Sequence, residues 1–534
     1  MNDIPHTERA VQLVGPDKLE LNAAKPVADP GPHQVLAKVE AVGLCFSDLK
    51  LLKQFSQHSR KSDVLTGLDA QALAEMPNYV PGDTPTVPGH EAVIRVVKVG
   101  PGVGRYKTGE RFIVETDYRW LPTDKSNAAF GYNFEGGLQE YVLLDERVIT
   151  SPDGESMLIP APEDLSASAL ALVEPWACVE NAYTEVQRRT LKPGGRLLVV
   201  GDAPVDRAVV DKCPGKSGSV VFVAGAGVAA QANASFDDIL YLGADAATAE
   251  ALFAKLAPGG LLAIVQDGGK FGRQVETQVG RVHYGGIRVV GTVGADPAAA
   301  YAAIPASPEI RDGDRINIVG AAGPMGTMHV IRDLCQGAAG VTVYAGDLND
   351  DRLAGLDAIA APLAEKNAVK LRTYNPSRNP PGVAFDYVVL MAPVPALVAQ
   401  AVVAAAPKAI VNVFAGIPAD KTAAIDLDAY VEKQLYFVGT SGSELKDMQQ
   451  VLAKVVAREL DTNFSVAAVA GLEGAIDGIR AVEHNLLPGK ILVYPSCRGL
   501  KLTALGDLGG DTPLGPGQWN LEAETALLRR FVKP

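Results

Sequence analysis

The most informative segment of this chain is Ile316-Asn-Ile-Val-Gly320-Ala-Ala-Gly323-Pro324-Met325-Gly326, which joins an apolar strand to a glycine-rich turn. A helix is expected directly after it, over residues 327–334. Such a turn lets the backbone approach a pyrophosphate, and the N-terminus of the next helix provides N–H donors at the positive end of the helix dipole. The order of strand, turn and helix predicts a doubly wound parallel sheet that binds a dinucleotide.

A second strand, expected over residues 340–345, leads to Asp347. The spacing between Gly323 and Asp347 is close to that of the carboxylate that binds the ribose hydroxyls of an adenosine. Because a carboxylate repels a 2′-phosphate, NAD is favoured over NADP, although Arg352 tempers that preference. The alternative is a sheet turn without a ligand. The predicted contacts with the dinucleotide are Gly320, Gly323, Pro324, Met325, Gly326, Asp347 and Arg352.

An earlier part of the chain repeats these elements in the same order. Five segments match between the two parts. The first two matches are offset by 119 and 121 positions, and the last three by 149, 146 and 148. Because the offset increases between the second and third matches, the earlier copy lacks a stretch of residues in its middle. The matched segments are Gly201 with Gly320, 220–225 with 341–346, 236–242 with 385–391, 263–266 with 409–412, and 290–294 with 438–442. Near-constant offsets favour a duplicated domain over the alternative that all parallel strands are rich in Val and Ile.

The two copies differ at the glycine-rich turn. The earlier copy has Gly201-Asp202 there, and it lacks the second and third glycines. Asp202 would place a negative charge where a phosphate binds in the later copy. We therefore predict that the earlier copy has a structural role and holds no dinucleotide.

The length of 534 residues exceeds what one hydrophobic core supports, so several domains are expected. Residues 1–189 contain short Val-rich segments between Gly and Pro turns, which predicts a β-rich domain with a long loop or lid over residues 53–85. Residues 190–310 form the degenerate repeat, and residues 311–459 form the repeat that binds NAD. Residues 460–534 are too few for a domain and are expected to complete the first one.

The composition limits the partners of the chain. A formal net charge of -13 disfavours nucleic acid, because phosphate backbones repel an acidic surface. The N-terminal residues lack the apolar core of a signal peptide, and no apolar run is long enough to predict a membrane span. The five cysteines are widely scattered, which argues against a disulfide framework and favours a reducing, cytoplasmic location.

Two short motifs in the β-rich region carry metal-binding chemistry. Cys45 lies in Gly43-Leu-Cys45-Phe-Ser47-Asp48, and His90 lies in Gly89-His90-Glu91. A thiolate, an imidazole and carboxylates suit zinc, which lowers the pKa of an alcohol so that a hydride can leave to NAD. Together with residues 135–142, 174–178 and 489–495, these motifs resemble the zinc-dependent medium-chain dehydrogenase/reductase superfamily and suggest its sorbitol and sugar-phosphate branch.

The resemblance implies an α/β fold in which a β-rich, GroES-like catalytic domain is joined to two Rossmann-like repeats. It implies one catalytic zinc, because no four-cysteine cluster lies between Glu115 and Gly137. The implied metal ligands are Cys45, His90 and either Glu174 or Glu91. The implied catalytic residues are Ser47, which would bind the substrate oxygen, Asp48, which would orient His90, and Glu174. The implied nicotinamide contacts are Ala415, Gly416, Thr440 and Ser441.

Two features depart from the family pattern. Cys45 and His90 are 45 positions apart, which is longer than usual, and the excess is the segment 53–85, which we expect to shape the substrate pocket. Lys50 stands where many relatives have a proton-relay histidine. It would relay protons, bind an anionic substrate or lie in solvent.

The predicted activity is a zinc-dependent transfer of hydride between NAD(H) and a secondary alcohol or ketone of a polyol, sugar or sugar phosphate. One alternative is a zinc-independent enoyl or quinone reductase, which the residues Gly320-Ala-Ala-Gly323 resemble; the other is a non-catalytic NAD-binding protein. Members of the superfamily commonly pair through the edge strands of their nucleotide domains. We therefore expect either a homo-oligomer or a pseudo-dimer within one chain, in which residues 287–292 meet residues 435–440.

Overall fold

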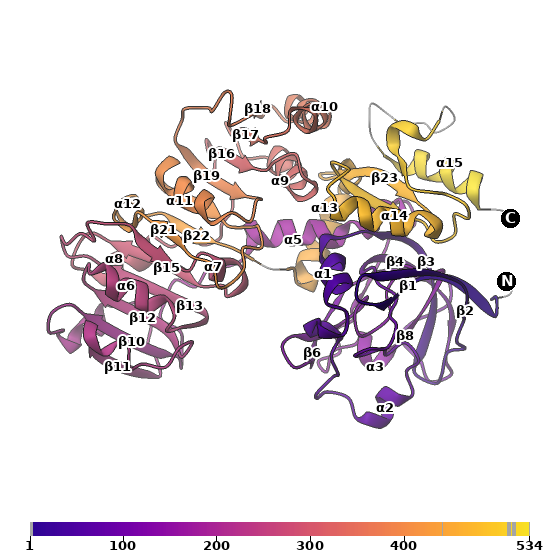
Figure 1. The fold of residues 1–534 in the computed structure, drawn as a ribbon, viewed down its shortest axis with the longest axis horizontal. Coiled ribbons are helices and arrows are strands. Elements are labelled where there is room, and N and C mark those ends of the chain that lie inside the picture. The colour runs from indigo at the N-terminus through magenta and orange to yellow at the C-terminus, as the bar shows by residue number, and fades with distance from the viewer. Residues whose placement is uncertain (1–3, 441, 510–513, 515–518, 533–534) are drawn as a thin grey trace. The chain divides into compact units, whose positions relative to one another are not determined.

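The computed structural model describes residues 4–440, 442–509, 514 and 519–532. The chain divides into two compact units (Figure 1), one formed by Met1–Ala177 with Glu444–Pro534 and the other by Cys178–Ser443. The second unit thus begins and ends somewhat earlier than the two repeats predicted from the sequence, which span residues 190–459. Helix α5 (Val173–Thr184) carries residues of both units.

The first unit is built on an eight-stranded, mostly antiparallel sheet with the order β25-β23-β24-β3-β4-β5-β9, in which β8 also pairs with β3. Its strands are β1 (Thr7–Gly15), β2 (Lys18–Pro26), β3 (Gln34–Gly43), β4 (Glu91–Val99), β5 (Arg111–Val114), β6 (Asp117–Pro122), β7 (Asn127–Ala129), β8 (Tyr141–Asp145), β9 (Leu158–Pro160), β23 (Val466–Ala470), β24 (Lys490–Val493) and β25 (Thr503–Ala504). Its helices are α1 (Phe46–Gln54), α2 (Ala70–Ala74), α3 (Glu146–Ile149), α4 (Ala167–Ala171), α13 (Leu445–Val456), α14 (Leu472–Glu483) and α15 (Leu521–Phe531). Because β24 pairs with β3, residues far along the chain complete the sheet of the first unit.

The second unit contains two parallel sheets, one from each copy of the repeat. The earlier copy contains β10 (Arg196–Gly201), β11 (Ser219–Ala224), β12 (Phe236–Leu242), α6 (Ala246–Phe253), β13 (Leu256–Val265), β14 (Val275–Thr277), α7 (Gly280–Tyr284), β15 (Arg288–Thr292) and α8 (Pro297–Ala302). The later copy contains β16 (Arg315–Val319), α9 (Pro324–Cys335), β17 (Thr342–Gly346), α10 (Asp350–Lys366), β18 (Lys370–Tyr374), β19 (Phe385–Leu390), α11 (Pro395–Ala404), β20 (Ala405–Asn412), β21 (Ala423–Ile425), α12 (Leu427–Glu432) and β22 (Tyr436–Val438). The central strands are apolar and buried on both faces because helices cover them, as parallel sheets require. The predicted α/β class is therefore confirmed.

The strand orders of the two copies explain why the earlier copy is shorter. The earlier sheet has the order β11-β10-β12-β13-β15, and the later one has the order β18-β17-β16-β19-β20-β22. Helix α10 and strand β18 have no counterpart in the earlier copy, where a single 3₁₀ turn, Gly225–Gly227, lies between β11 and β12. The helix after the first turn is also reduced to a 3₁₀ segment, Arg207–Lys212, in place of α9.

The two copies meet through short strands that pair in the pattern of a local two-fold axis. Strands β14 and β21 pair antiparallel, and Glu276 faces Ala424, which lies 148 positions later. This separation lies within the range of the last three offsets, 146 to 149 positions, so each strand pairs with its own counterpart, as in an isologous interface. The edge strands β15 and β22 also contact each other, although they belong to separate sheets. The segments expected to meet, 287–292 and 435–440, are therefore in contact.

The segment 53–85, predicted as a loop or lid, holds three short helices: Phe55–Gln57, Ser59–Lys61 and α2. Lys61 is fully buried within it and donates hydrogen bonds to the carbonyl groups of Val80 and Thr84. The two ends of the segment are thereby tied together. Among the described residues, no helix has the length and apolar character needed to cross a lipid bilayer.

Candidate metal centre and nucleotide crevice

The candidate metal centre lies where β3 ends and β4 begins. The two strands are antiparallel neighbours, and Gly43 on β3 faces Glu91 on β4. This register places Cys45, at the start of α1, beside His90 and Glu91. One ligand atom from each of these three residues lies within 4.8 Å of the other two. The two motifs found in the sequence, far apart along the chain, thus meet at one point of the fold.

The orientation of His90 is set by two neighbours on α1. Its Nδ1 lies 3.0 Å from Oδ1 of Asp48, and its Nε2 lies 3.1 Å from Oγ of Ser47. The second carboxylate oxygen of Asp48 accepts the backbone N–H of Cys45 at 3.0 Å. Burial by itself would lower the pKa of His90, but the facing Asp48 charge raises that pKa well above its ordinary value. Asp48 therefore connects the thiol-bearing residue with the imidazole.

Glu91 is fully buried and is held from one side only. Its Oε1 forms an ion pair with Lys490, whose ammonium group also donates to the carbonyl of Leu44. Its Oε2 has no hydrogen-bond partner among the described residues. A buried carboxylate oxygen without a partner, beside a thiol and an imidazole, is a donor set that suits zinc.

Two further carboxyl groups lie in the electrostatic surroundings of this cluster. Burial, together with the charge of Glu91, raises the pKa of Glu174 on α5 to about 7, although it lies outside the three-residue cluster. Burial and the charge of Glu174 raise the pKa of Glu115 to about 8. Glu115 was not among the site residues predicted from the sequence; the available signal was a carboxylate directly after the apolar strand β5. Lys490 was missed as a partner of Glu91 as well.

Lys50 has an exposed position on α1 and lies outside the three-residue cluster. Its charge reaches His58 of the segment 53–85, whose pKa is lowered to about 4 by burial, then by Arg60 and Lys50. The His58 ring lies 5.1 Å from the ring of Tyr132, and the Tyr132 ring lies 5.8 Å from His90. The segment 53–85 thus contributes side chains to the surroundings of the candidate metal centre.

The glycine-rich turn of the later copy has the geometry of a phosphate cradle. Gly320 has a φ of +84°, which favours glycine, and a Cβ at Gly326 would lie 2.3 Å from the Gly320 carbonyl oxygen. At Gly323, by contrast, the nearest heavy atom to a Cβ would lie 3.7 Å away. The first helical residues of α9, Pro324 and Met325, are half-buried. The space above Gly323 is therefore free for a ligand at the N-terminus of α9.

Four of the other predicted cofactor residues, Asp347, Ala415, Gly416 and Thr440, follow strands of the same sheet. Asp347 follows β17, and its carboxylate accepts the backbone N–H of Ala322 in the turn at 3.2 Å. Arg352 is half-buried in the first turn of α10. Ala415 follows β20 and Thr440 follows β22, where the Thr440 hydroxyl bonds to Asn181 at 2.6 Å. Gly416 is next to Ala415, and Ser441 lies outside the described residues.

The equivalent crevice of the earlier copy is filled differently. The carboxylate of Asp202 accepts hydrogen bonds from the backbone N–H groups of Ala244 and Asp245 and from the hydroxyl of Tyr241. These bonds hold Asp202 against the turn that leads from β12 into α6. A cavity of about 730 Å³ remains there, and its lining has more carboxylates, Asp202, Asp206, Asp245 and Asp267, than ammonium groups, Lys212 and Lys270. The charge of this crevice opposes binding of a pyrophosphate.

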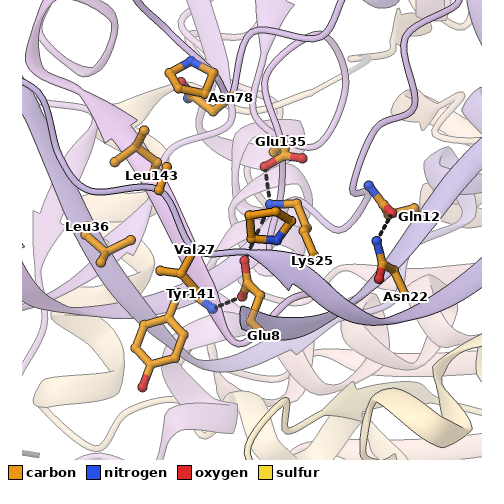
Figure 2. A pocket seen from close by; sticks show the side chains of 13 residues that line it. Glu8, Gln12, Asn22, Lys25, Val27, Leu36, Asn78, Glu135, Tyr141 and Leu143 are labelled. Atoms are coloured by element: carbon orange, nitrogen blue, oxygen red, sulfur yellow. Dashed lines mark hydrogen bonds and ion pairs between the residues drawn. The ribbon is translucent and has the colours of Figure 1, made fainter. Parts of the chain in front are cut away.

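A smaller cavity of about 320 Å³ lies in the first unit against the β1–β2 hairpin (Figure 2). Lys25 lies at its centre and binds Glu135 and Gln139 at 2.9 Å each and Glu8 at 3.4 Å. Burial raises the pKa of Glu8 to about 7, against the opposing charge of Lys25. None of the residues that line this cavity belongs to the candidate metal centre.

Comparison with known proteins supports the resemblance seen in the sequence. Residues 31–153 match the family model of the alcohol dehydrogenase GroES-like domain. The (R,R)-butanediol dehydrogenase of Bacillus subtilis (strain 168) is 30% identical over 206 residues, which are 35% of this chain and 49% of that protein. The sorbitol dehydrogenase of Gallus gallus is 28% identical over 209 residues, which are 37% of this chain and 50% of that protein. The chain thus spans about half the length of these curated relatives.

A solved structure supports the fold. The crystal structure of 2R,3R-butanediol dehydrogenase from Bacillus subtilis matches with a TM-score of 0.54 and 17% sequence identity. The match covers 92% of this chain and 100% of that chain.

Proposed function

Because the chain belongs to the alcohol dehydrogenase-like medium-chain dehydrogenase/reductase superfamily, we propose that it is a zinc- and NAD-dependent oxidoreductase that acts on alcohols. We propose as its substrates secondary alcohols of polyols, sugars or sugar phosphates. The names of two relatives, a sorbitol and a butanediol dehydrogenase, support substrates with neighbouring hydroxyl groups.

The observation that carries this proposal is the convergence of Cys45, His90 and Glu91 within 4.8 Å. These three residues would hold the zinc, and Glu174 would lie beside it. A zinc ion bound there would act as a Lewis acid that makes an alcohol proton easier to remove. Fold similarity alone would not support this chemistry, because function depends on the site.

The roles of the surrounding side chains follow from their positions. Ser47, 3.1 Å from Nε2 of His90, would hydrogen-bond the alcohol oxygen and take part in removing its proton. Asp48 would hold the ring of His90 from the Nδ1 side, which fixes the tautomer that leaves Nε2 as a ligand atom. Lys50, exposed on the same helix, would pass protons to solvent or attract an anionic substrate.

The cofactor would bind along the carboxyl edge of the later sheet. The N–H groups at the start of α9 would hold the pyrophosphate above Gly323. Asp347 would bind the ribose hydroxyls and exclude a 2′-phosphate, with Arg352 in the first turn of α10 as an opposing charge. The loops at 414–416 and 439–442 would contact the nicotinamide.

The proposed division of the chain is a catalytic domain over residues 1–189 and 460–534, a degenerate repeat over 190–310 and an NAD-binding repeat over 311–459. The pairing of β24 with β3 and the two separate parallel sheets support this order. The hydrogen bonds of Asp202 support the proposal that the earlier repeat holds no dinucleotide.

The test is the zinc content of the purified protein, measured with NAD-linked activity on a panel of polyols for the wild type and for Cys45→Ala. We expect about one zinc per chain in the wild type and loss of both zinc and activity in Cys45→Ala. Cys335→Ala, which removes a thiol outside the cluster, is the control and should retain both.

Three outcomes separate the candidate functions. Full activity in Cys45→Ala would overturn zinc catalysis. Reduction of enones or quinones by a zinc-free protein would instead support the reductase. NAD binding without turnover of any of these substrates would support a non-catalytic protein.

A further inference from the structure

The earlier copy reaches both loops that are expected to hold the nicotinamide. Arg288, at the start of β15, is 9% exposed, and one of its guanidinium nitrogens lies 3.3 Å from the carbonyl oxygen of Gly439. The same side chain is fixed by Gln187 at 3.0 Å and by Glu185 at 3.0 Å. Gln187 in turn accepts the hydroxyl of Tyr436 on β22 at 2.8 Å. A network that includes β15 therefore holds the start of the loop 439–442.

Helix α7 of the earlier copy packs against the same two loops. His283 Nδ1 lies 3.3 Å from the carbonyl oxygen of Val413, directly before the loop 414–416. A Cβ at Gly439 would lie 2.9 Å from the His283 Cα. The backbone at Gly439 thus approaches α7 so closely that only glycine fits there.

The Tyr284 side chain lies against the other loop. A Cβ at Gly416 would lie 2.5 Å from the Tyr284 hydroxyl, so this hydroxyl occupies the space beside the loop backbone. Tyr284 is 43% exposed, and its ring packs edge-on against His283 at 4.6 Å. Tyr284 is therefore a side chain of the degenerate copy that can be changed without opening a core.

We propose that the degenerate copy positions the nicotinamide loops of the NAD-binding copy, with Tyr284 and Arg288 as its positioning residues. This inference rests on the proposed use of NAD. The earlier copy, which we predict to hold no dinucleotide, would support binding by its neighbour through these contacts. Tyr284 restricts the loop 414–416, and Arg288 restricts the loop 439–442, so that less freedom is lost when the nicotinamide binds.

The experiment compares two ligands that share the adenosine, the pyrophosphate and a ribose. NAD carries the nicotinamide and ADP-ribose does not, so the ratio of their dissociation constants reports on the nicotinamide loops alone. We expect Tyr284→Ala to weaken NAD binding by roughly five- to ten-fold, on the order of one lost contact, and to leave ADP-ribose binding unchanged. Tyr284→Phe, which removes the hydroxyl nearest the loop but keeps the ring, should give a smaller loss of NAD affinity than Tyr284→Ala.

Two further variants complete the design, with calorimetric titration as the measurement. Arg288→Lys keeps the charge but not the forked contacts. Like Tyr284→Ala, it should raise the dissociation constant of NAD relative to that of ADP-ribose. Val220→Ala, on the edge strand β11 away from β15 in the earlier sheet, is the matched control and should change neither constant.

The outcomes distinguish this inference from the proposed function. Equal NAD affinity in the wild type, Tyr284→Ala and Arg288→Lys would overturn the positioning role while the proposed function stands. Parallel weakening of NAD and ADP-ribose would also overturn it, because it would indicate a general loss of structure. A wild type that binds neither ligand would refute the use of NAD itself.

Discussion

Asp48 performs two structural tasks with one side chain. One oxygen accepts the N–H of Cys45 and so begins α1, and the other faces Nδ1 of His90. The positions of the thiol and the imidazole therefore depend on the same carboxylate. Partners of this kind usually matter for metal affinity almost as much as the ligands.

We predict that Asp48→Asn lowers zinc affinity by roughly 10- to 100-fold with little loss of folding stability. An amide can still accept the Cys45 N–H, but it no longer attracts a positive charge on the imidazole. Competition with a chelator measures the affinity. Asp145→Asn, which changes the cap of α3 in the same unit, is the control, and a similar loss of zinc in both variants would contradict the prediction.

Glu8 predicts a pH dependence of stability. Its pKa is raised from 4.5 to about 7, mainly by burial, so the folded protein keeps this proton up to a higher pH than the unfolded chain. The resulting stability is fully present below about pH 4.5 and is lost as the pH rises through 7.

Between pH 5 and pH 8 the free energy of unfolding of the wild type should therefore fall. In Glu8→Gln this fall should be smaller, by on the order of 2 kcal/mol, because the glutamine cannot titrate. Urea unfolding at the two pH values measures it. Glu20→Gln, at an exposed position of the same hairpin, should behave as the wild type. An unaltered pH profile in Glu8→Gln would show that Glu8 titrates as an ordinary carboxyl group.

Among the structural elements, the turn between β16 and α9 contains two glycines that differ in the space around them: a side chain at Gly326 would clash with the backbone, whereas one at Gly323 would not. Gly326→Ala places a methyl group 2.3 Å from a backbone oxygen, so it should destabilise the protein by roughly 1–3 kcal/mol. Gly323→Ala meets no heavy atom closer than 3.7 Å and should fold almost normally, but its methyl group would occupy the phosphate cradle. Thermal unfolding and NAD titration separate the two effects. Normal NAD affinity in Gly323→Ala would show that the dinucleotide does not lie over this turn.

Most of the elements could be predicted because local sequence determines them. The apolar runs became strands: the expected segment 236–242 is β12 itself. The stretch missing from the earlier copy proved to be α10 with β18, which the offsets could size but not identify. The short helices of segment 53–85 were missed, because helices of three to five residues are too short to show a hydrophobic periodicity.

The candidate metal centre was predictable only in part. Cys45, His90 and Glu91 carry recognisable motifs. The ion pair of Glu91 with Lys490 depends instead on the pairing of β24 with β3, which joins residues almost 400 positions apart. Glu115 approaches Glu174 for a similar reason: tertiary packing, rather than any local pattern, brings them together.

Considered as a whole molecule, the chain unites its two repeats through one hydrophobic core. Residues of both copies belong to the same buried cluster, and Val431 of α12 packs against Gly291 of β15. Val431→Ala should therefore lower stability by roughly 2 kcal/mol and increase hydrogen exchange in β15 as well as in α12. Val398→Ala, a change of the same size on α11, should spare β15. Exchange confined to the later copy in both variants would show that the copies are energetically independent.

The antiparallel pairing of β14 with β21 has an evolutionary meaning. In a symmetric homodimer every substitution appears on both sides of the axis, and dilution separates the partners. Here the two sides are separate stretches of one polypeptide, so each has been free to mutate alone while the covalent tether keeps its counterpart at a high effective concentration. One side could therefore give up its own ligand without the other losing its companion.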